Sequence, residues 1–359
     1  MVLKSFPKSN KIYLISDIHG GLKPLQELVS NIEENSYLFI LGDIFEKGID
    51  SLKTLEYIIE LSKKDNVFVI MGNNDYALLK ILDPFNIESF KKRINRKTSI
   101  IYQIIDRYNL VGSEEYLQKR INEIFKVELD WINCLDTYIE IEDFVLVHAG
   151  VDAKSIKESS FKALVGLDNF YNIGHSLSKI VICGHYPVSM YRLDRYDNSV
   201  LIDLDKKIIC IDGGYGATNI GQINMLEITK SNNGYSYKTY SRDYYLEALV
   251  VKPQVGKRIS RGVCWPHYQL ELIKKGKYFS KVRINTNEIV KIKNELMEIK
   301  NDTVYALDDS PNNLLDVREN DIIKVMNNKT KGYLLGSING ECGWISYSKV
   351  KYIRGERND

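Results

Sequence analysis

The chain has 359 residues, more than one hydrophobic core usually supports, so we expect two or three domains. Its formal net charge of only +2 excludes a general electrostatic attraction to nucleic acid or to membranes. The first ten residues, MVLKSFPKSN, lack the apolar core of a signal peptide, and nowhere are about eighteen consecutive residues apolar, so neither a signal peptide nor a transmembrane helix is predicted. The five cysteines stand singly, which favours reduced thiols and a cytoplasmic protein.

Three short apolar runs open the chain, and each ends at a side chain that can bind a metal ion. KIYLIS precedes Asp17 and His19, YLFILG precedes Asp43, and VFVIMG precedes Asn73, with a helix-length segment between runs. Short runs without a polar gap are typical of strands buried on both faces, so the pattern predicts an α/β fold with a β-α-β-α-β start. Ligand sites of such sheets lie at the carboxyl ends of the strands.

A long helical insertion is expected next, over residues 76–137, because apolar residues recur there at three- and four-residue spacing. We interpret it as a cap on the core. Three basic residues, Lys47, Arg107 and Arg192, are candidates for binding a substrate phosphate, although solvated helix faces also carry such charges.

Strand-like runs then resume. FVLVHAG contains His148, IVICGHYP contains His185, and KKIICIDGGYG ends in a glycine-rich turn before GQINMLEI. His175 lies between the two histidine runs without a partner at metal-ligand spacing, so we interpret it as a surface histidine.

The strand-end residues form one set of oxygen and imidazole ligands without a thiolate, namely Asp17, His19, Asp43, Asn73, His148 and His185. This set suits Mn²⁺, Fe or Zn²⁺ in an open site. Six ligands are too many for one tetrahedral ion, and a carboxylate such as Asp43 can bridge two ions, so we expect two divalent cations. Such a pair promotes in-line displacement at phosphorus.

The motifs SDIHGG, GDIFEKG, GNND, VHAG and GHYP, in this order, resemble the signature of the calcineurin-like metallophosphoesterases. The bacterial phosphoprotein phosphatase branch is the most similar. The resemblance spans residues 11–228 and implies a β-sandwich flanked by helices. It also implies that Asp17, His19 and Asp43 bind one metal, and that Asp43, Asn73, His148 and His185 bind the other.

Two positions depart from the family pattern. Glu46 stands where the family carries an aspartate, and Asn74 stands where it carries the histidine that protonates the leaving group. General acid catalysis contributes about 10² to 10⁴ in rate, and an amide supplies no proton at neutral pH. We therefore take Asn74 and Glu46 as the candidate catalytic positions, with His175 or a metal-bound water as rival proton donors.

The composition changes near residue 240, so we expect residues 1–240 to form a self-sufficient catalytic domain. Residues 241–300 are β-rich and basic, with twelve Lys and Arg against four Glu over 251–300. Such a charge excess suits phosphate-rich partners, but it also describes the solvated face of a small sheet.

The last segment, residues 301–359, resembles a Src-homology-3 (SH3) domain through VYALDD, LLDVRENDIIKV and GYLLGSINGECGWISYSKVKYI. It implies a small β-barrel and a peptide or protein partner. Asp308, Ser310 and Ser346 replace residues of the family's ligand groove, which weakens the expectation of a proline-peptide ligand. Residues 241–300 are a candidate for a first barrel of the same kind.

The sequence therefore predicts a dinuclear phosphoesterase acting on a phosphoprotein or a nucleotide, most similar to serine/threonine protein phosphatases. One alternative is a phosphodiesterase or dinucleoside polyphosphate hydrolase that acts on nucleotides or nucleic acid. A second alternative is a non-catalytic scaffold that works through its SH3-like segments. Intact ligands argue against the scaffold.

Overall fold

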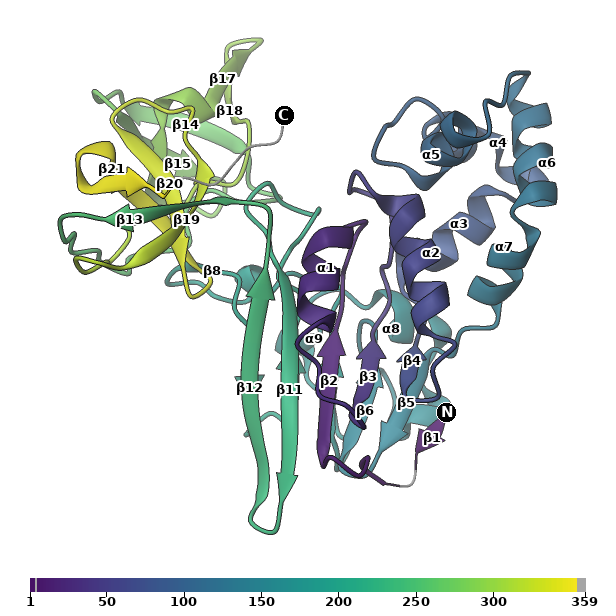
Figure 1. The fold of residues 1–359 in the computed structure, drawn as a ribbon. Coiled ribbons are helices and arrows are strands. Elements are labelled where there is room, and N and C mark those ends of the chain that lie inside the picture. The colour runs from purple at the N-terminus through teal and green to yellow at the C-terminus, as the bar shows by residue number, and fades with distance from the viewer. Residues whose placement is uncertain (4, 354–359) are drawn as a thin grey trace. The chain divides into compact units, whose positions relative to one another are not determined.

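The computed structural model describes residues 1–3 and 5–353 (Figure 1). The chain folds into two compact units. Unit 1 comprises Met1–Pro187, Val200–Ala217 and Ile223–Arg242, and unit 2 comprises Val188–Ser199, Thr218–Gln222 and the chain from Asp243. Over the described residues, no helix combines the length and apolar character needed to cross a membrane.

The first sheet of unit 1 carries the opening strands of the chain. Its strand order is β12-β11-β2-β3-β4, with bounds β2 (Lys11–Ile15), β3 (Tyr37–Ile40), β4 (Val67–Val69), β11 (Ile223–Ser231) and β12 (Gly234–Arg242). β2, β3 and β4 run parallel, as the sequence predicts, whereas β11 pairs antiparallel with β2. The carboxyl ends of the three parallel strands therefore meet at one edge.

The second sheet of unit 1 contains the histidine strands. Its order is β1-β5-β6-β7-β10-β9, with bounds β1 (Val2–Leu3), β5 (Tyr138–Ile141), β6 (Phe144–Val147), β7 (Ile180–Cys183), β9 (Leu201–Asp203) and β10 (Ile208–Cys210). β6, β7 and β10 are parallel neighbours.

The two sheets pack face to face, and side-chain alternation along β2 shows why its apolar run has no polar gap. Ile12 and Leu14 belong to the cluster between the sheets, while Tyr13 and Ile15 belong to the cluster beneath the helices. Successive side chains of a strand point to opposite faces, so both faces of β2 are buried. One cover is a layer of helices and the other is the second sheet, which confirms the α/β fold.

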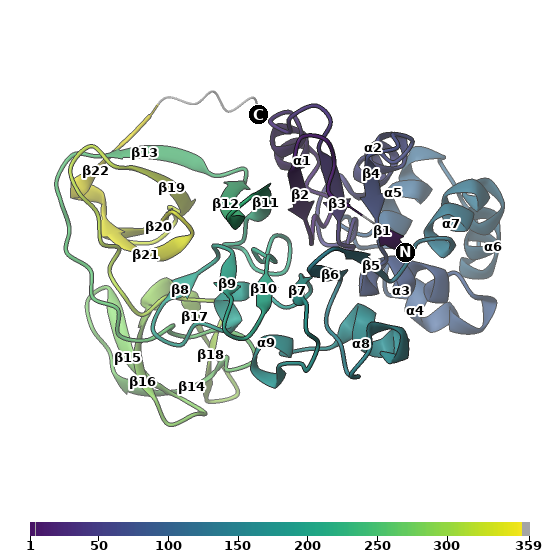
Figure 2. The ribbon, with the colours of Figure 1, turned by 90° about the horizontal axis from the view of Figure 1, so that it is seen from below.

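Helices flank both sheets of unit 1. They are α1 (Leu22–Val29), α2 (Ser51–Leu61), α3 (Asn73–Ile81), η1 (Pro84–Asn86), α4 (Ile87–Lys91), α5 (Ile100–Arg107), α6 (Glu114–Ile124), α7 (Lys126–Asn133), η2 (Ile156–Glu158), α8 (Phe161–Gly166) and α9 (Phe170–Ile173). Figure 2 shows α8 and α9 outside the sheet of β6 and β7, and α1 and α2 outside the sheet of β2 to β4.

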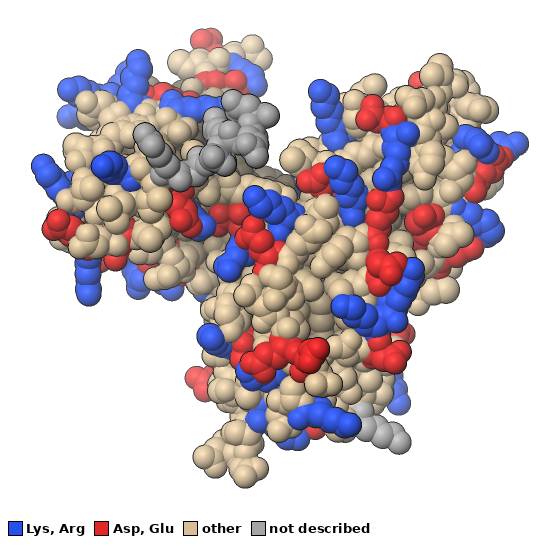
Figure 3. All heavy atoms as spheres, in the orientation of Figure 1, with Lys and Arg blue, Asp and Glu red and all other residues tan. Residues whose placement is uncertain are grey.

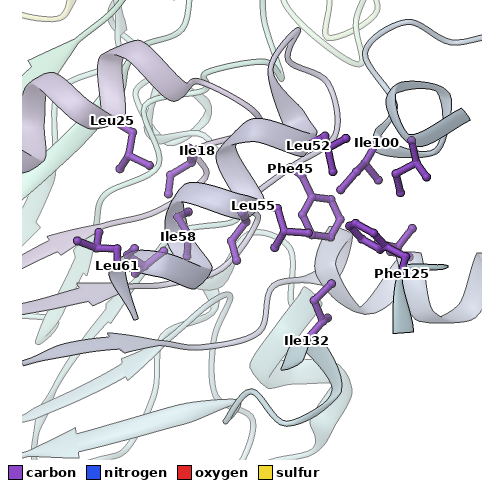
Figure 4. Close-up of a cluster of buried hydrophobic side chains, with 14 of the residues drawn as sticks. Ile18, Leu25, Phe45, Leu52, Leu55, Ile58, Leu61, Ile100, Phe125 and Ile132 are labelled. Atoms are coloured by element: carbon purple, nitrogen blue, oxygen red, sulfur yellow. The ribbon is translucent and has the colours of Figure 1, made fainter. Parts of the chain in front are cut away.

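The helices from α3 to α7 occupy the stretch predicted to be a helical insertion, and their apolar faces join the core of unit 1. Figure 4 shows Phe45, from the loop after β3, beside Leu55 of α2 and close to Ile100 and Phe125 of the insertion. All four side chains are almost fully buried. The insertion is thus anchored to the loop that carries Asp43.

Unit 2 consists mainly of strands in two sheets. One has the order β22-β13-β19-β20-β21-β8 and the other β16-β15-β14-β18-β17. Their bounds are β8 (Tyr196–Asp197), β13 (Leu246–Val250), β14 (Gln269–Lys274), β15 (Phe279–Ile284), β16 (Ile289–Lys293), β17 (Met297–Lys300), β18 (Thr303–Ala306), β19 (Ile322–Asn327), β20 (Tyr333–Ile338), β21 (Glu341–Ser346) and β22 (Val350–Tyr352). The short helix η3 (Val188–Met190) precedes β8, η4 (Asn294–Leu296) lies between β16 and β17, and η5 (Tyr347–Lys349) lies between β21 and β22.

The β-rich character of this region is confirmed, but its internal division differs from the sequence-based one. The predicted boundary between residues 300 and 301 falls inside the β17–β18 hairpin, and β18 pairs with β14. β13 pairs with β19, so the predicted segments 241–300 and 301–359 share both sheets. Neither sheet closes into a barrel over the described residues, and residues 354–359 lie outside them. A change in composition reveals turns but not which distant strands pair.

Candidate metal centre

The polar residues expected at strand ends do gather in unit 1. Asp17 and His19 follow β2 and Asp43 follows β3, and one ligand atom from each lies within 4.8 Å of the other two. Asn73 opens α3, while His148 and His185 follow β6 and β7. The histidine sheet and the opening sheet thus both contribute to one centre.

Asp43 stands between two histidines. Its Oδ2 lies 3.6 Å from His19 Nε2, and its Oδ1 lies 3.5 Å from His148 Nε2. Each carboxylate oxygen therefore faces a different imidazole, an arrangement that would let Asp43 be shared by two cations.

The ring nitrogens of His148 show which atoms are free to bind a cation. Burial lowers its pKa, so the ring is neutral and carries one proton. Its Nδ1 lies 2.6 Å from the Leu41 carbonyl oxygen and must donate to it. The Nε2 lone pair then faces Asn73 Oδ1 at 3.0 Å, and His185 Nδ1 lies 2.8 Å from the same oxygen. Acceptors that converge in this way fit a cation between them.

Asp17 carries an unsatisfied buried oxygen at this site. Its Oδ2 accepts hydrogen bonds from Ser16 Oγ (2.5 Å) and His185 N (2.9 Å), whereas Oδ1 is buried without a hydrogen-bond partner in the described structure. Burial and the charge of Asp43 raise the pKa of Asp17 to about 8. A divalent cation would both fill the empty coordination of Oδ1 and offset the charge repulsion.

The backbone at the centre is held in an uncommon conformation. Asp17, His19, Asp43 and His185 have φ of 51°, 44°, 52° and 67°. Residues other than glycine rarely adopt positive φ, and each such residue costs about 1 kcal/mol or more. Four of the six predicted ligands share this conformation, which indicates that packing forces their side chains to converge.

Two glycines allow the ligand loops to approach one another. A Cβ at Gly184 would lie 1.9 Å from Ser16 Oγ and 2.2 Å from Asp17 Oδ2. A Cβ at Gly72 would lie 2.3 Å from Asp43 N. Any side chain at either position would push the loops apart.

Asp75 is a residue of the centre whose role the sequence did not predict. Its carboxylate accepts the backbone N–H groups of Asp43 (2.9 Å), Ile44 (3.0 Å) and Gly72 (2.8 Å), so it ties the loop after β3 to the start of α3. Burial and the charge of Asp43 raise its pKa to about 7. Its place in GNND, two residues after Asn73, was the available signal.

Asn74 and Lys47 both lie at the centre. Asn74 donates to Asp43 twice, from its backbone N to Oδ1 (2.8 Å) and from its side-chain amide to Oδ2 (2.6 Å). The Lys47 ammonium lies 3.1 Å from His19 Nε2. Asn74 therefore orients a predicted ligand, and Lys47 places a positive charge beside His19.

Glu46, Arg107 and Arg192 are engaged elsewhere. Glu46 Oε1 accepts from Ser99 Oγ (2.9 Å) and Ile100 N (3.1 Å), so this carboxylate caps α5. Arg107 pairs with Glu56 on the exposed side of α5. Arg192 belongs to unit 2, where its guanidinium donates to the carbonyl oxygens of Asp197 and Ser199, both at 2.8 Å.

His175 and Asp168 also form hydrogen bonds that bear on the predicted site. His175 hydrogen-bonds to backbone atoms through both ring nitrogens, with Lys207 O at 3.0 Å and Leu177 N at 3.1 Å, so neither nitrogen is available as a proton donor in this conformation. Asp168 Oδ1 lies 3.0 Å from His185 Nε2 and directs Nδ1 toward Asn73. It lies in a loop between short helices, and nothing in its sequence context predicted this contact.

Comparison with known families agrees with this arrangement. The family described as calcineurin-like phosphoesterase matches residues 10–209, which is more than half of the chain. The chain belongs to this family. The predicted enzyme class, a metal-dependent hydrolase of phosphate esters, is confirmed at the level of the family, and the donor set of Asp17, His19 and Asp43 fits the divalent metals that it uses.

Similar proteins include two bacterial enzymes named bis(5'-nucleosyl)-tetraphosphatase, symmetrical. The one from Chromobacterium violaceum is 29% identical over 143 residues, covering 39% of this chain and 43% of that protein. The one from Vibrio cholerae is 30% identical over 142 residues, covering 39% and 44%. The matched regions thus span less than half of each relative.

Two solved structures also show some similarity to the chain. A serine/threonine phosphatase from Saccharomyces cerevisiae, described as similar to human PP5, has 12% identity and a TM-score of 0.45, covering 68% of this chain and 84% of that one. A metallophosphoesterase from Sphaerobacter thermophilus has 14% identity and a TM-score of 0.34, covering 65% and 88%. The family assignment does not rest on these two likenesses.

Proposed function

We propose that the protein hydrolyses phosphoanhydride bonds of nucleoside polyphosphates, with dinucleoside polyphosphates as the first substrate class to test. The observation that carries the proposal is the amide of Asn74 at the position where the family carries a proton donor. That amide is already hydrogen-bonded to Asp43 Oδ2 at 2.6 Å. A leaving group therefore has to depart without help from this position.

The leaving group decides which substrates suit such a site. An alkoxide, as released from phosphoserine, is strongly basic and needs a proton as the bond breaks. A nucleoside diphosphate is a far weaker base, since phosphate groups have a second pKa of about 6. The names of the Chromobacterium and Vibrio relatives, which refer to dinucleoside tetraphosphates, point to the same class.

The residues of the chain have distinct roles in this proposal. Asp17, His19, Asp43, Asn73, His148 and His185 would hold two divalent cations, which when bound activate water and offset charge on the phosphates. Lys47 binds a phosphate oxygen through its ammonium group. Asn74 orients the Asp43 carboxylate and Asp75 holds the backbone of its loop, so the oxygens of Asp43 stay directed toward the cations. Manganese stays the predicted metal, with iron or zinc as alternatives.

A substrate panel tests the proposal. We expect kcat/KM for diadenosine tetraphosphate to exceed that for a phosphoserine peptide by about 10²-fold or more, the lower limit of what a missing general acid costs. Bis(p-nitrophenyl) phosphate, a diester with a weakly basic leaving group, should also be hydrolysed. Turnover of the phosphoserine peptide at a rate equal to that of the anhydride would refute the proposal.

That result would favour the second candidate, a serine/threonine protein phosphatase. The order of the five motifs and the positive charge of Lys47 support it, because a phosphomonoester dianion also needs a nearby cation. A peptide or protein partner for the segment resembling an SH3 domain and a cytoplasmic location stay predictions.

A further inference from the structure

Unit 2 contains a basic groove that plays no part in the metal centre. The groove has a volume of about 390 Å³ and is lined by five lysines, Lys274, Lys275, Lys277, Lys281 and Lys291. All five are exposed, and none of their ammonium groups forms an ion pair with a described carboxylate. Figure 3 shows that Lys and Arg side chains project from unit 2 on the face drawn.

Three of these lysines stand side by side across the sheet. Lys281 of β15 lies opposite Lys274 of β14 and also opposite Lys291 of β16. Neighbouring strands are about 4.8 Å apart, so the row spans about 10 Å. Like charges directly opposite each other destabilise a sheet. A row of unpaired ammonium groups is therefore costly for the free protein and favourable once an anionic chain crosses it.

Aromatic rings line the same groove. Tyr278 and Tyr333 have ring centroids 5.8 Å apart, and Phe279 lies 5.1 Å from Tyr333. Below them the buried Lys293 ammonium lies 5.3 Å from the Tyr278 centroid and 4.9 Å from that of Phe279, and it donates to Lys331 O at 2.6 Å. The rings are held in place before any ligand binds, which lowers the entropic cost of stacking.

We propose that this groove binds single-stranded nucleic acid. The lysines would contact successive phosphates, and Tyr278 would stack on an unpaired base, a combination typical of proteins that bind single strands. A duplex hides its base faces, and an acidic peptide has none, so both would leave the aromatic rings unused. The groove lies entirely in unit 2, so the proposal is independent of the proposed hydrolytic activity.

The test is a fluorescence anisotropy titration of the full chain with a labelled oligothymidylate of about twelve nucleotides, within the size range of such sites. A chelator in the titration buffer prevents hydrolysis of the oligonucleotide by the metal centre. The double variant Lys281→Gln/Lys291→Gln should bind at least tenfold more weakly at low salt. Its plot of log affinity against log salt should be shallower by about 1.4, or about 0.7 per lost phosphate contact. Tyr278→Ala should weaken binding about tenfold, whereas Tyr278→Phe should not.

The control is Lys252→Gln/Lys257→Gln, which removes the same charge from two exposed lysines of unit 2 outside the groove. It should bind like the wild type. The circular dichroism spectra and the unfolding midpoints of all variants should match those of the wild type, which checks the folding of unit 2. Equal losses in the control and the groove variant would overturn the proposal. So would tighter binding to the matching duplex, or binding to phosphatidylserine vesicles but not to the oligonucleotide.

Discussion

Asp43 is the residue on which the metal centre depends most, because each of its oxygens faces a different histidine. Asp43→Asn should lower kcat/KM for p-nitrophenyl phosphate more than about 100-fold, since even residues that only support a ligand change activity about 10- to 100-fold. Thermal unfolding of the metal-free variant should stay cooperative, because the change keeps the size of the side chain and an amide oxygen can still accept the backbone N–H of Asn74.

Asp205→Asn is the matched control for this variant. Asp205 lies in the exposed turn before β10, and the same change there should alter neither activity nor unfolding. If Asp43→Asn retains wild-type turnover, Asp43 is not shared between two cations.

Asn74 offers a second prediction at the residue scale. Asn74→His restores the imidazole that the family carries and should raise kcat/KM for alkyl phosphate monoesters about 10- to 100-fold, with little change for bis(p-nitrophenyl) phosphate. We expect less than the full effect of a general acid because Glu46, which would have to orient the imidazole, is bound to Ser99 and Ile100. An unchanged ratio between the two substrates would show that the proton comes from elsewhere.

At the scale of elements, Glu46 joins the ligand loop to the helical insertion. Glu46→Gln replaces charge-assisted hydrogen bonds to Ser99 and Ile100 and removes the ion pair with Arg93, whose Nε lies 3.6 Å from Oε2. Hydrogen bonds to a charged group contribute about 1.5 to 3 kcal/mol each to stability. Because Ile100 is the first residue of α5, the amides of α5 should lose protection against hydrogen exchange in the variant. Glu56→Gln, which breaks only the exposed pair with Arg107, should cost less than about 1 kcal/mol. If Glu46→Gln and Glu56→Gln lower stability equally, Glu46 does not anchor the helical insertion to the ligand loop.

The hairpin between β5 and β6 should show a defined pH dependence. Burial acts to raise the pKa of Glu142, but Lys230 and the backbone N–H of Phe6 outweigh it, and the pKa is lowered. A carboxylate with a lowered pKa in the folded protein stabilises it above the unfolded value of about 4.3, and this contribution is lost as pH falls through the folded pKa.

Glu142→Gln should therefore lower the free energy of unfolding by about 1 to 2 kcal/mol at neutral pH, and by progressively less in acid. Urea unfolding of both proteins at neutral and acidic pH measures the difference. A difference independent of pH would contradict the assigned role of the charge.

At the scale of the whole molecule, all six predicted ligands belong to unit 1. A chain truncated after Arg242 should therefore hydrolyse p-nitrophenyl phosphate with a kcat/KM of the same order as the full chain. It should also be less soluble. The truncated chain keeps Tyr196, which belongs to unit 2, but it loses Asp309, to which the Tyr196 hydroxyl donates in the full chain. A truncated chain that folds but is inactive would mean that unit 2 completes the site.

Sequence patterns predicted the strands and their polar ends well, for a physical reason. A strand buried on both faces must be continuously apolar, so KIYLIS and YLFILG can be recognised as strands from the sequence. The residues that follow such strands meet at one edge of the sheet. The role of Glu46 was not predictable, because it depends on Ser99 and Ile100 more than fifty residues away. The pairing of β18 with β14 was also not predictable, because the alternation of polar and apolar residues along a strand does not show which other strand it pairs with.

The most direct test of the two-cation centre is a count of bound metal. The full chain is dialysed against Mn²⁺, and the metal bound per chain is measured by elemental analysis, with Asp43→Asn treated in parallel. The converging atoms of Asp17, His19, Asp43, Asn73, His148 and His185 predict two ions per wild-type chain and a loss of metal from the variant. One ion or none in the wild type, or two in Asp43→Asn, would contradict the account.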